Sequence, residues 1–275
     1  MARILFLMMF PFVCFSQITP SEDIPVNNLL KEKENLDTKR KASYNLDEIK
    51  VRWKKAALEN CTGVPCVVTP PAPSFTCGTS TVSDGDGNSY QTVGIGTQCW
   101  TKSNLKATKY NDGYPIPDLT STGWPANTGA RTVYGGSSPV TGYVDTYGYL
   151  YNWYAAAGIV SSGGSSTKNI CPSGWHVPTN SDWNTLISFL GTNPGTQLKE
   201  NSSLWTTTPG SNTSGFSARP GGYRFNTGGS TDINNKVFFW ESLGDYSSLD
   251  NTGNVTVSTW PKDTGASIRC LKDGI

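Results

Sequence analysis

The chain has 275 residues, and its 22 lysine and arginine residues nearly balance its 21 aspartate and glutamate residues, for a formal net charge of +1. This balance excludes a global positive field of the kind that attracts nucleic acid or an anionic membrane, so no nucleic-acid partner is expected. The single histidine, His176, and the lack of a Cys-x-x-Cys pair leave no zinc-ligand pattern in the sequence.

Residues 1–16 have the pattern of a secretory signal peptide. Arg3 supplies the positive charge, Ile4 to Phe15 form an almost unbroken apolar run, and small residues stand where signal peptidase cleaves, before Gln17. One alternative is a membrane anchor, but the run is shorter than the roughly 20 apolar residues that span a bilayer. The other is a lipoprotein anchored through Cys14, which lacks the small residue usually found before such a cysteine.

The rest of the chain is therefore expected outside the cytoplasm, in the periplasm, on the cell surface or in the medium. No later segment is long and apolar enough to be a transmembrane segment. Export also places the remaining cysteines in an oxidising compartment, where an even number indicates disulfide bridges. These six cysteines are Cys61, Cys66, Cys77, Cys99, Cys171 and Cys270.

Their connectivity is open, because six cysteines allow many pairings. Spacing favours a small local loop closed by Cys61 and Cys66, and a clasp between Cys77 and Cys99 across a predicted hairpin. Cys171 and Cys270 would then join the middle of the chain to its end.

Two segments precede the main domain. Residues 17–60 carry nine basic and eight acidic residues, and apolar residues recur at helical spacing between Asn45 and Asn60. A docking or solvated helix is favoured there over a membrane-binding one. Residues 61–76 contain Cys61, Cys66 and the run Pro70-Pro71-Ala72-Pro73, which predicts a stiff linker.

Residues 77–275 are predicted to form one α+β domain. Turn-forming residues at 84–88 precede Tyr90, Val93 and Ile95, which predicts a hairpin leading into a strand. Apolar spacing predicts a helix over 145–157, and a second one begins at Thr179, which has capping-box spacing to Asp182. That helix is expected to stop at Gly191. Shorter strands are expected over 215–219, 236–240, 254–260 and 266–271.

A series of motifs in this domain resembles the Fibrobacter succinogenes major paralogous domain, a family common in exported proteins of Bacteroidetes and Fibrobacteres. The resemblance covers about residues 82–273. It rests on the motifs Asp86-Gly87-Asn88, Ile95-Gly96-Thr97-Gln98-Cys99-Trp100, Asn104-Leu105-Lys106, Tyr147-Gly148-Tyr149-Leu150-Tyr151-Asn152-Trp153, Cys171-Pro172-Ser173-Gly174-Trp175-His176-Val177-Pro178-Thr179, Pro220-Gly221-Gly222-Tyr223-Arg224 and Ile268-Arg269-Cys270.

The family has no established function, but it resembles the C-type-lectin-like fold. In lectin-like folds a disulfide joins the region of the first helix to the last strand, and Cys171 with Cys270 suits that role. The resemblance also places a ligand face in the loop-rich region 202–250. The polar candidates on this face are Tyr223, Arg224, Asn226, Glu241 and Asp245, with a buried Arg224 paired to a late carboxylate as the alternative.

The tryptophans are expected to divide between core and surface. Trp100, Trp153, Trp175 and Trp183 lie on helix stripes or within the motifs and are expected in the core. Trp124, Trp205 and Trp240 lie in or beside loops rich in Gly, Thr and Asn, so they are the candidates for exposed rings that stack on sugars.

Two further segments contain candidate site residues. Asp84, Asp86 and Asn88 alternate as oxygen ligands in a Gly-rich loop, which suits calcium, but Ser89 and Ile95 stand where an EF-hand requires Gly and Glu. A hairpin turn is therefore favoured, and no cofactor is expected unless calcium binds there. His176 has no nucleophile or acid signature to serve, so a structural histidine near the helix start is favoured.

The sequence thus predicts an exported, non-enzymatic binding module that recognises a glycan or an extracellular protein through a loop-rich face. One alternative is an enzyme, or an enzyme-associated module, that acts on envelope or plant polysaccharide. The other is a structural protein for surface display. The sequence does not indicate an oligomeric state.

Overall fold

The computed structural model describes residues 74–119, 124, 127–160 and 168–274. The predicted signal peptide (1–16), the charged segment (17–60) and the Cys61–Cys66 pair all lie outside these residues. Residues from Phe75 onward form one compact unit. None of the helices in the described ranges is long and apolar enough to cross a bilayer.

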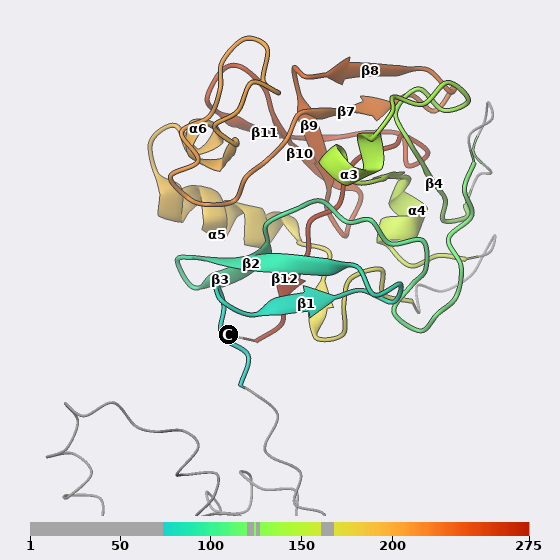
Figure 1. Cartoon of the computed structure of the whole chain (residues 1–275), viewed down its shortest axis with the longest axis horizontal. Coiled ribbons are helices and arrows are strands. Elements are labelled where there is room, and N and C mark those ends of the chain that lie inside the picture. Colours follow the sequence, from blue (N-terminus) through green and yellow to red (C-terminus); the bar gives the residue numbers. More distant parts are fainter. Residues whose placement is uncertain (1–73, 120–123, 125–126, 161–167, 275) are drawn as a thin grey trace, which may run out of the picture. The chain divides into compact units, whose positions relative to one another are not determined.

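The first sheet joins the beginning of the domain to its end (Figure 1). Its strands, in spatial order, are β1 (Thr81–Ser83), β2 (Ser89–Ile95), β3 (Gln98–Thr101), β12 (Leu271–Lys272) and β6 (Trp175–His176). The predicted hairpin is confirmed, because β1 and β2 pair in antiparallel fashion on either side of residues 84–88. Strand β12 lies between β3 and β6, so the last residues of the chain are built into the sheet that the domain opens with.

The second sheet contains the strands of the loop-rich half. In spatial order they are β11 (Val255–Thr259), β10 (Asp245–Leu249), β9 (Val237–Trp240), β7 (Gly221–Arg224) and β8 (Ser230–Ile233). The predicted strands 236–240 and 254–260 are confirmed as β9 and β11. The prediction of a strand over 215–219 is wrong, because Ser217 has a left-handed backbone (φ 57°) and only Ala218 forms a bridge.

The predicted strand 266–271 is reduced to β12 and to isolated bridges at Ala266 and Ser267. Ser267 lies beside Phe239 in parallel fashion, and its N–H donates to the Phe238 carbonyl. This segment therefore crosses from the second sheet toward the first instead of forming one continuous strand.

The helix that begins at Thr179 is confirmed as α5 (Asn180–Leu190). The Thr179 side chain accepts from the Asp182 N–H, the Asp182 side chain accepts from the Thr179 N–H, and Gly191 closes the helix. A short helix, α6 (Pro194–Leu198), follows.

The prediction of one helix over 145–157 is wrong. The segment forms α3 (Tyr143–Tyr147), β5 (Leu150–Tyr151) and α4 (Trp153–Ala156), and β5 pairs with β4 (Arg131–Thr132). Gly148 ends α3 with φ 76°, and a Cβ there would lie 2.6 Å from the Leu105 carbonyl oxygen. The Asn152 side chain then caps α4. Local apolar spacing was overridden by this glycine turn, although the α+β class is retained.

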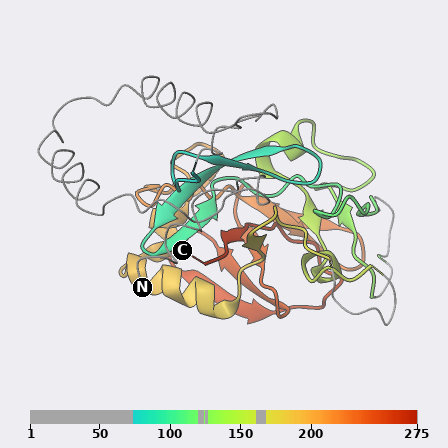
Figure 2. The same cartoon turned by 90° about the horizontal axis from the view of Figure 1, so that it is seen from below.

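Aromatic side chains fill the core on both faces of the second sheet. On one face Trp183 of α5 packs on Phe239, with ring centroids 5.5 Å apart, and Trp100 of β3 lies 5.2 Å from Trp183. Figures 1 and 2 show α5, in yellow, beside the teal strands of the first sheet. On the opposite face Phe238 and Trp240 belong to the core that surrounds Cys171 and Cys270. Alternate side chains of β9 thus point to opposite faces of the sheet, and both faces are buried.

Candidate functional site

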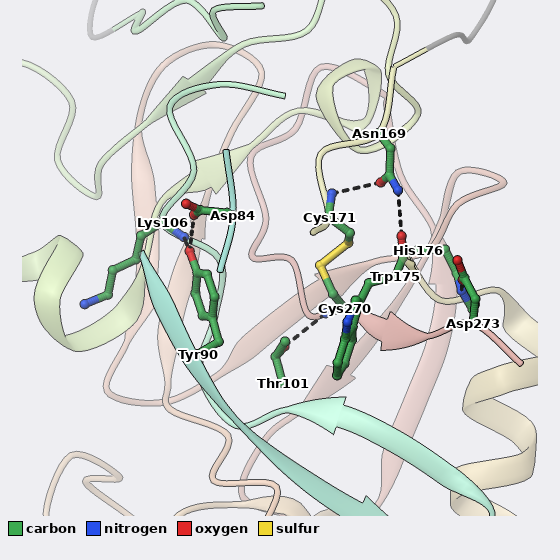
Figure 3. Close-up of a disulfide and its surroundings, with 10 residues drawn as sticks. All are labelled: Asp84, Tyr90, Thr101, Lys106, Asn169, Cys171, Trp175, His176, Cys270 and Asp273. Carbon is green, nitrogen blue, oxygen red and sulfur yellow. Dashed lines mark hydrogen bonds and ion pairs between the residues drawn. A yellow bond between two sulfur atoms is a disulfide. The ribbon is translucent and has the colours of Figure 1, made fainter. Parts of the chain in front are cut away.

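Two of the three predicted disulfides are formed, and the third lies outside the described residues. Cys77 is bonded to Cys99, and Cys171 to Cys270. Figure 3 shows how the second bond is held. The Asn169 side chain accepts from the Cys171 N–H and donates to the Trp175 carbonyl, and the Cys270 N–H donates to Thr101 Oγ1. These contacts make the Cys171–Thr179 motif part of the framework, by which we mean the two sheets, α5 and the disulfide-bonded segments that join them.

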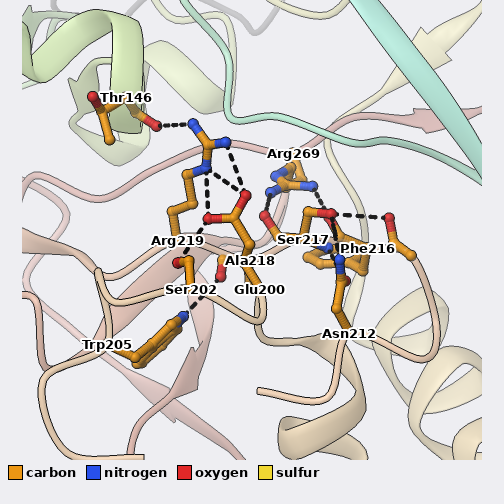
Figure 4. Close-up of polar contacts among 11 residues, drawn as sticks. Thr146, Glu200, Ser202, Trp205, Asn212, Phe216, Ser217, Ala218, Arg219 and Arg269 are labelled. Atoms are coloured by element: carbon orange, nitrogen blue, oxygen red, sulfur yellow. Dashed lines mark hydrogen bonds and ion pairs between the residues drawn. The ribbon is translucent and has the colours of Figure 1, made fainter. Parts of the chain in front are cut away.

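The Arg269 side chain of the Ile268-Arg269-Cys270 motif is 1% exposed and makes four hydrogen bonds; Figure 4 draws it beside two of its acceptor residues, Phe216 and Ser217. It donates to the Asn104 side-chain oxygen at 2.7 Å and to the Thr101 and Phe216 carbonyls at 2.7 Å. The fourth bond, 2.9 Å long, goes to the Ser217 carbonyl. Burial lowers the pKa of Arg269 to about 9, and at neutral pH the guanidinium remains charged among these acceptors.

A second arginine lies beside this one, nearer the surface (Figure 4). Arg219 binds the Glu200 carboxylate through Nε and Nη2, at 3.0 and 2.8 Å, and donates to the Thr146 carbonyl. Ser202 donates to the same carboxylate. The charge of Arg219 is thus paired with Glu200, while Arg269 is buried among neutral acceptors.

His176 joins three parts of the framework. Its Nδ1 lies 2.5 Å from Asp273 Oδ1, drawn in Figure 3, and its Nε2 lies 3.4 Å from Asp182 Oδ2 at the start of α5. Burial raises the pKa of Asp182, but hydrogen bonds from Thr179 and His176 outweigh it and hold this pKa below its usual value. This arrangement supports the structural interpretation of the histidine.

The oxygen atoms of the proposed calcium loop are occupied within the protein. Asp84 accepts from the Asp86 and Asn88 N–H groups, the Asn88 side chain and the Tyr90 hydroxyl. Asp86 accepts from the Thr108 side chain and is paired with a lysine. Among the described residues no group of three or more His, Cys, Asp or Glu side chains is placed to hold a metal ion. These contacts hold residues 84–88 as the turn between β1 and β2.

The prediction that Trp124, Trp205 and Trp240 are exposed is wrong. They are 6%, 2% and 0% exposed, and each indole N–H donates to a backbone carbonyl. The Lys199 ammonium lies 4.9 Å from the Trp205 ring centroid. Trp240 lies on β9 of the second sheet, which is covered on both faces, and its ring belongs to the core. Loop-forming neighbours in the sequence do not indicate exposure when a loop folds back over its own aromatic residue. These three rings offer no surface to a ligand.

Two of the polar candidates are buried as well. Arg224 is fully buried, lies 4.5 Å over the Trp124 ring and donates to the Phe225 carbonyl. Its pKa is lowered by burial, which the Asp263 carboxylate opposes, so the alternative of a buried arginine near a late carboxylate is the correct one. Glu241 is also fully buried and accepts from the Ser247 hydroxyl, and burial raises its pKa.

The remaining candidates stay accessible but do not form one cluster by themselves. Asn226 is exposed in the turn between β7 and β8, Asp245 begins β10 and is half-buried, and Tyr223 of β7 is half-buried. What surrounds Tyr223 is a group of aromatic rings from four segments of the second sheet.

We call this group the aromatic shelf. It consists of Tyr223 and Phe225 on or after β7, Phe238 on β9, Tyr246 on β10 and Trp260 after β11. The Trp260 centroid lies 4.1 Å from that of Tyr246, 4.5 Å from Phe238 and 4.6 Å from Tyr223. Phe225 extends the group, 4.9 Å from Tyr223. The rings are therefore in mutual contact and hold one another in place.

The shelf has a buried base and an accessible outer side. Phe238 and Tyr246 are 5% and 8% exposed, whereas Phe225 is 41% exposed and Tyr223 and Trp260 are half-buried. Three polar residues lie near these outer rings. Asn226 directly follows Phe225 in the sequence, Lys262 lies two residues after Trp260, and Asp232 interacts electrostatically with Tyr223. Desolvation, followed by Asp232 and Tyr246, raises the pKa of Tyr223, so its hydroxyl stays protonated. Flat rings with polar neighbours can bind a ligand with apolar faces and hydroxyl groups.

A depression of about 400 Å³ lies between α4 and the turn at 242–244. It is lined by Trp153, His176 and Leu243, and Leu243 is 77% exposed. The Lys262 ammonium, two residues after Trp260, lies 3.9 Å from the Trp153 ring centroid. The predicted core position of Trp153 is thus only partly correct, since this ring is half-buried.

The sequence-based candidates include only Tyr223 of the five shelf residues. Phe225, Phe238, Tyr246 and Trp260 come from different strands, and no spacing along the chain relates them. One signal was available: Trp260 directly follows an alternating strand and precedes Pro261, where a strand must end.

Comparison with known proteins gives one match. Residues 93–272, more than half of the chain, match the model of a protein family described as the Fibrobacter succinogenes major domain. No curated protein and no solved structure matches the chain.

Proposed function

Because this chain belongs to the Fibrobacter succinogenes major domain family, and most of the motif side chains described above make contacts within the domain while Tyr223 lies on the aromatic shelf, we propose that its function resides in this shelf. The protein would be an exported, non-enzymatic module that binds a glycan. The observation that carries this proposal is the contact of five rings from four separate segments, of which Phe225 is exposed and Tyr223 and Trp260 are half-buried.

The chemistry of the shelf favours a sugar over an enzyme substrate. Aromatic faces pack against the apolar face of a pyranose ring. The neighbouring Asn226, Asp232 and Lys262 can donate hydrogen bonds to the sugar hydroxyl groups or accept hydrogen bonds from them. General acid–base chemistry would need a carboxyl or imidazole group placed over the ligand, and Glu241 and His176 are instead engaged in contacts within the framework.

Export is part of the same proposal. The disulfides Cys77–Cys99 and Cys171–Cys270 fit an oxidising compartment, as does the signal-peptide pattern of residues 1–16. Periplasm, cell surface and medium are all compatible with these features.

We further propose that the domain has a C-type-lectin-like fold. Three features support it: the pairing of the final strand β12 with β3, the disulfide from the segment before α5 to the residue before β12, and the second sheet formed by the loop-rich half. A crystal structure superposed on lectin-like domains would test this directly, and a different strand connectivity in the second sheet would contradict it.

The binding proposal is tested by a glycan microarray that carries bacterial-envelope and plant oligosaccharides, probed with the full-length exported protein. Wild-type protein is expected to bind, and Phe225→Ala and Tyr223→Ala to lose binding. Phe189→Ala is the matched control, because Phe189 is an exposed aromatic residue (63%) on α5, away from the shelf.

Other outcomes would overturn the proposal. Cleavage of an oligosaccharide by the wild-type protein would favour an enzyme. No binding to any glycan, together with capture of a specific extracellular protein that depends on Tyr223, would replace the glycan with a protein partner. Silence in both assays would leave surface display as the function.

A further inference from the structure

Strand β11 forms one edge of the second sheet, and among the described residues no strand pairs with its outer side. All five of its residues, Val255–Thr259, are paired with β10 on the inner side. The sequence Val-Thr-Val-Ser-Thr has no charge, no proline and no bulge, and Val257 is 37% exposed. Exposed edge strands usually carry charged residues, prolines or bulges, because an edge strand without them pairs readily with another strand.

The direction of the free backbone groups follows from the hairpin between β9 and β10. The Glu241 N–H donates to the Asp245 carbonyl, so the polar groups of Asp245 face β9. Because these groups alternate along an antiparallel strand, those of Tyr246 and Ser248 face β11, where their partners are Ser258 and Thr256. The N–H and C=O groups of Val255, Val257 and Thr259 consequently point outward from the sheet.

We propose that β11 pairs with β11 of a second copy of this chain, in antiparallel fashion and centred on Val257. This register places Val257 opposite its own copy and Val255 opposite Thr259, so the three outward-facing residues meet three outward-facing residues. About six backbone hydrogen bonds would form between the copies. No charged side chain faces a like charge within the paired segment, and β-branched residues occupy four of its five positions, which suits strand pairing.

The second copy is the occupant that this edge fits best because the segment is self-complementary. A two-fold axis between the two Val257 residues, perpendicular to the sheet, generates the same contacts in both directions, as closed dimers require. A peptide of unrelated sequence would not form the same contacts in both directions.

The association also places the two aromatic shelves together. The side chains of Thr256, Ser258 and Trp260 alternate with those of Val255, Val257 and Thr259, so they lie on the shelf face of the sheet. The two-fold axis leaves both shelves on the same face of one continuous sheet. Trp260 is three residues from the axis in each copy, so the two Trp260 backbones would be about 20 Å apart along the strands. A repeating ligand could then occupy both shelves, which raises its apparent affinity.

Sedimentation velocity of the full-length protein from about 1 µM to about 1 mM tests the association, whatever the shelf binds. Wild-type protein is expected to form dimers with rising concentration. Val257→Lys should weaken the dimer at least tenfold, because the two ammonium groups would lie directly opposite each other. Thr256→Lys is the matched control: it adds the same charge on the same strand but faces Ser258 of the other copy.

Thr259→Pro provides a second test that spares the monomer. The Thr259 N–H points outward, so its loss leaves the pairing with β10 intact and removes hydrogen bonds to the second copy only. Each variant is checked for folding by circular dichroism. A monomeric wild type over the whole range, or a dimer that Val257→Lys and Thr259→Pro leave unchanged, would overturn the proposal. Both results are independent of glycan binding.

Discussion

Replacing Arg269 with methionine tests how the buried framework of the domain is held together. Methionine has a similar length and apolar stem, so the change removes the guanidinium with little loss of volume. Three buried acceptors then lose their donor, namely the side-chain oxygen of Asn104 and the carbonyls of Thr101 and Phe216, and so does the half-buried carbonyl of Ser217.

The structure sets the size of the effect. A buried acceptor left without a donor costs about 1–3 kcal/mol, so the three buried ones imply a loss of at least about 3 kcal/mol. Domains of this kind are stable by only about 5–15 kcal/mol, so the variant is expected to lose a large share of its free energy of unfolding. Arg269→Lys keeps the charge but not the planar fork of donors, so an intermediate loss is expected.

Urea unfolding followed by tryptophan fluorescence, with the disulfides intact, measures these losses. The control is Arg219→Met, which removes an ion pair with Glu200 at the rim, where the Arg219 side chain is 38% exposed. That variant is expected to lose about 1 kcal/mol or less. The reasoning is refuted if Arg269→Met costs less than about 1 kcal/mol, or no more than Arg219→Met.

Two further predictions concern covalent and ionic contacts. Replacing both Cys171 and Cys270 with alanine should cost about 4.7 kcal/mol, and replacing Cys77 and Cys99 about 3.4 kcal/mol, because the closed loops span 99 and 22 residues; equal losses in denaturant titrations would contradict this. Asp182→Asn should cost about 1 kcal/mol near pH 7, since the folded-state pKa of this carboxyl lies below 3.8, and the difference should shrink as the pH falls below 3.8, where the wild type loses the same contribution. A difference independent of pH between 2.5 and 7 would show that the charge of Asp182 contributes nothing.

Local signals in the sequence were sufficient for the elements that local chemistry determines. The capping box at Thr179 and the stop at Gly191 predict α5 to the residue, because both act through contacts within a few residues. The turn formers at 84–88 predict the first hairpin for the same reason. The Cys171–Cys270 bond was also predicted, through the resemblance to a family and not through spacing alone.

Elements that depend on distant contacts could not be predicted in this way. The apolar spacing over 145–157 resembles a helix, yet Gly148 turns the chain against the Leu105 carbonyl, which is remote in sequence. Trp240 lies beside a turn in the sequence but within a strand that is covered on both faces. Sequence neighbours report local conformation, whereas burial depends on which segments lie above and below.

The candidate site also depends on contacts between residues that are distant in the sequence. Tyr223 was predicted, but the shelf is assembled from rings on β7, β9, β10 and the segment after β11, which only the sheet order brings together. The order β11-β10-β9-β7-β8 contains a crossover between β7 and β9 that no local pattern encodes. The site therefore follows from topology more than from any motif.

Isothermal titration calorimetry of the full-length protein with the oligosaccharide bound on the array tests the central claim most directly. Phe225→Ala, which removes an edge ring that is 41% exposed, is predicted to weaken binding at least tenfold, or about 1.4 kcal/mol, while Phe189→Ala leaves the affinity unchanged. An affinity of Phe225→Ala and Tyr223→Ala within about twofold of the wild type would contradict a glycan site on the aromatic shelf.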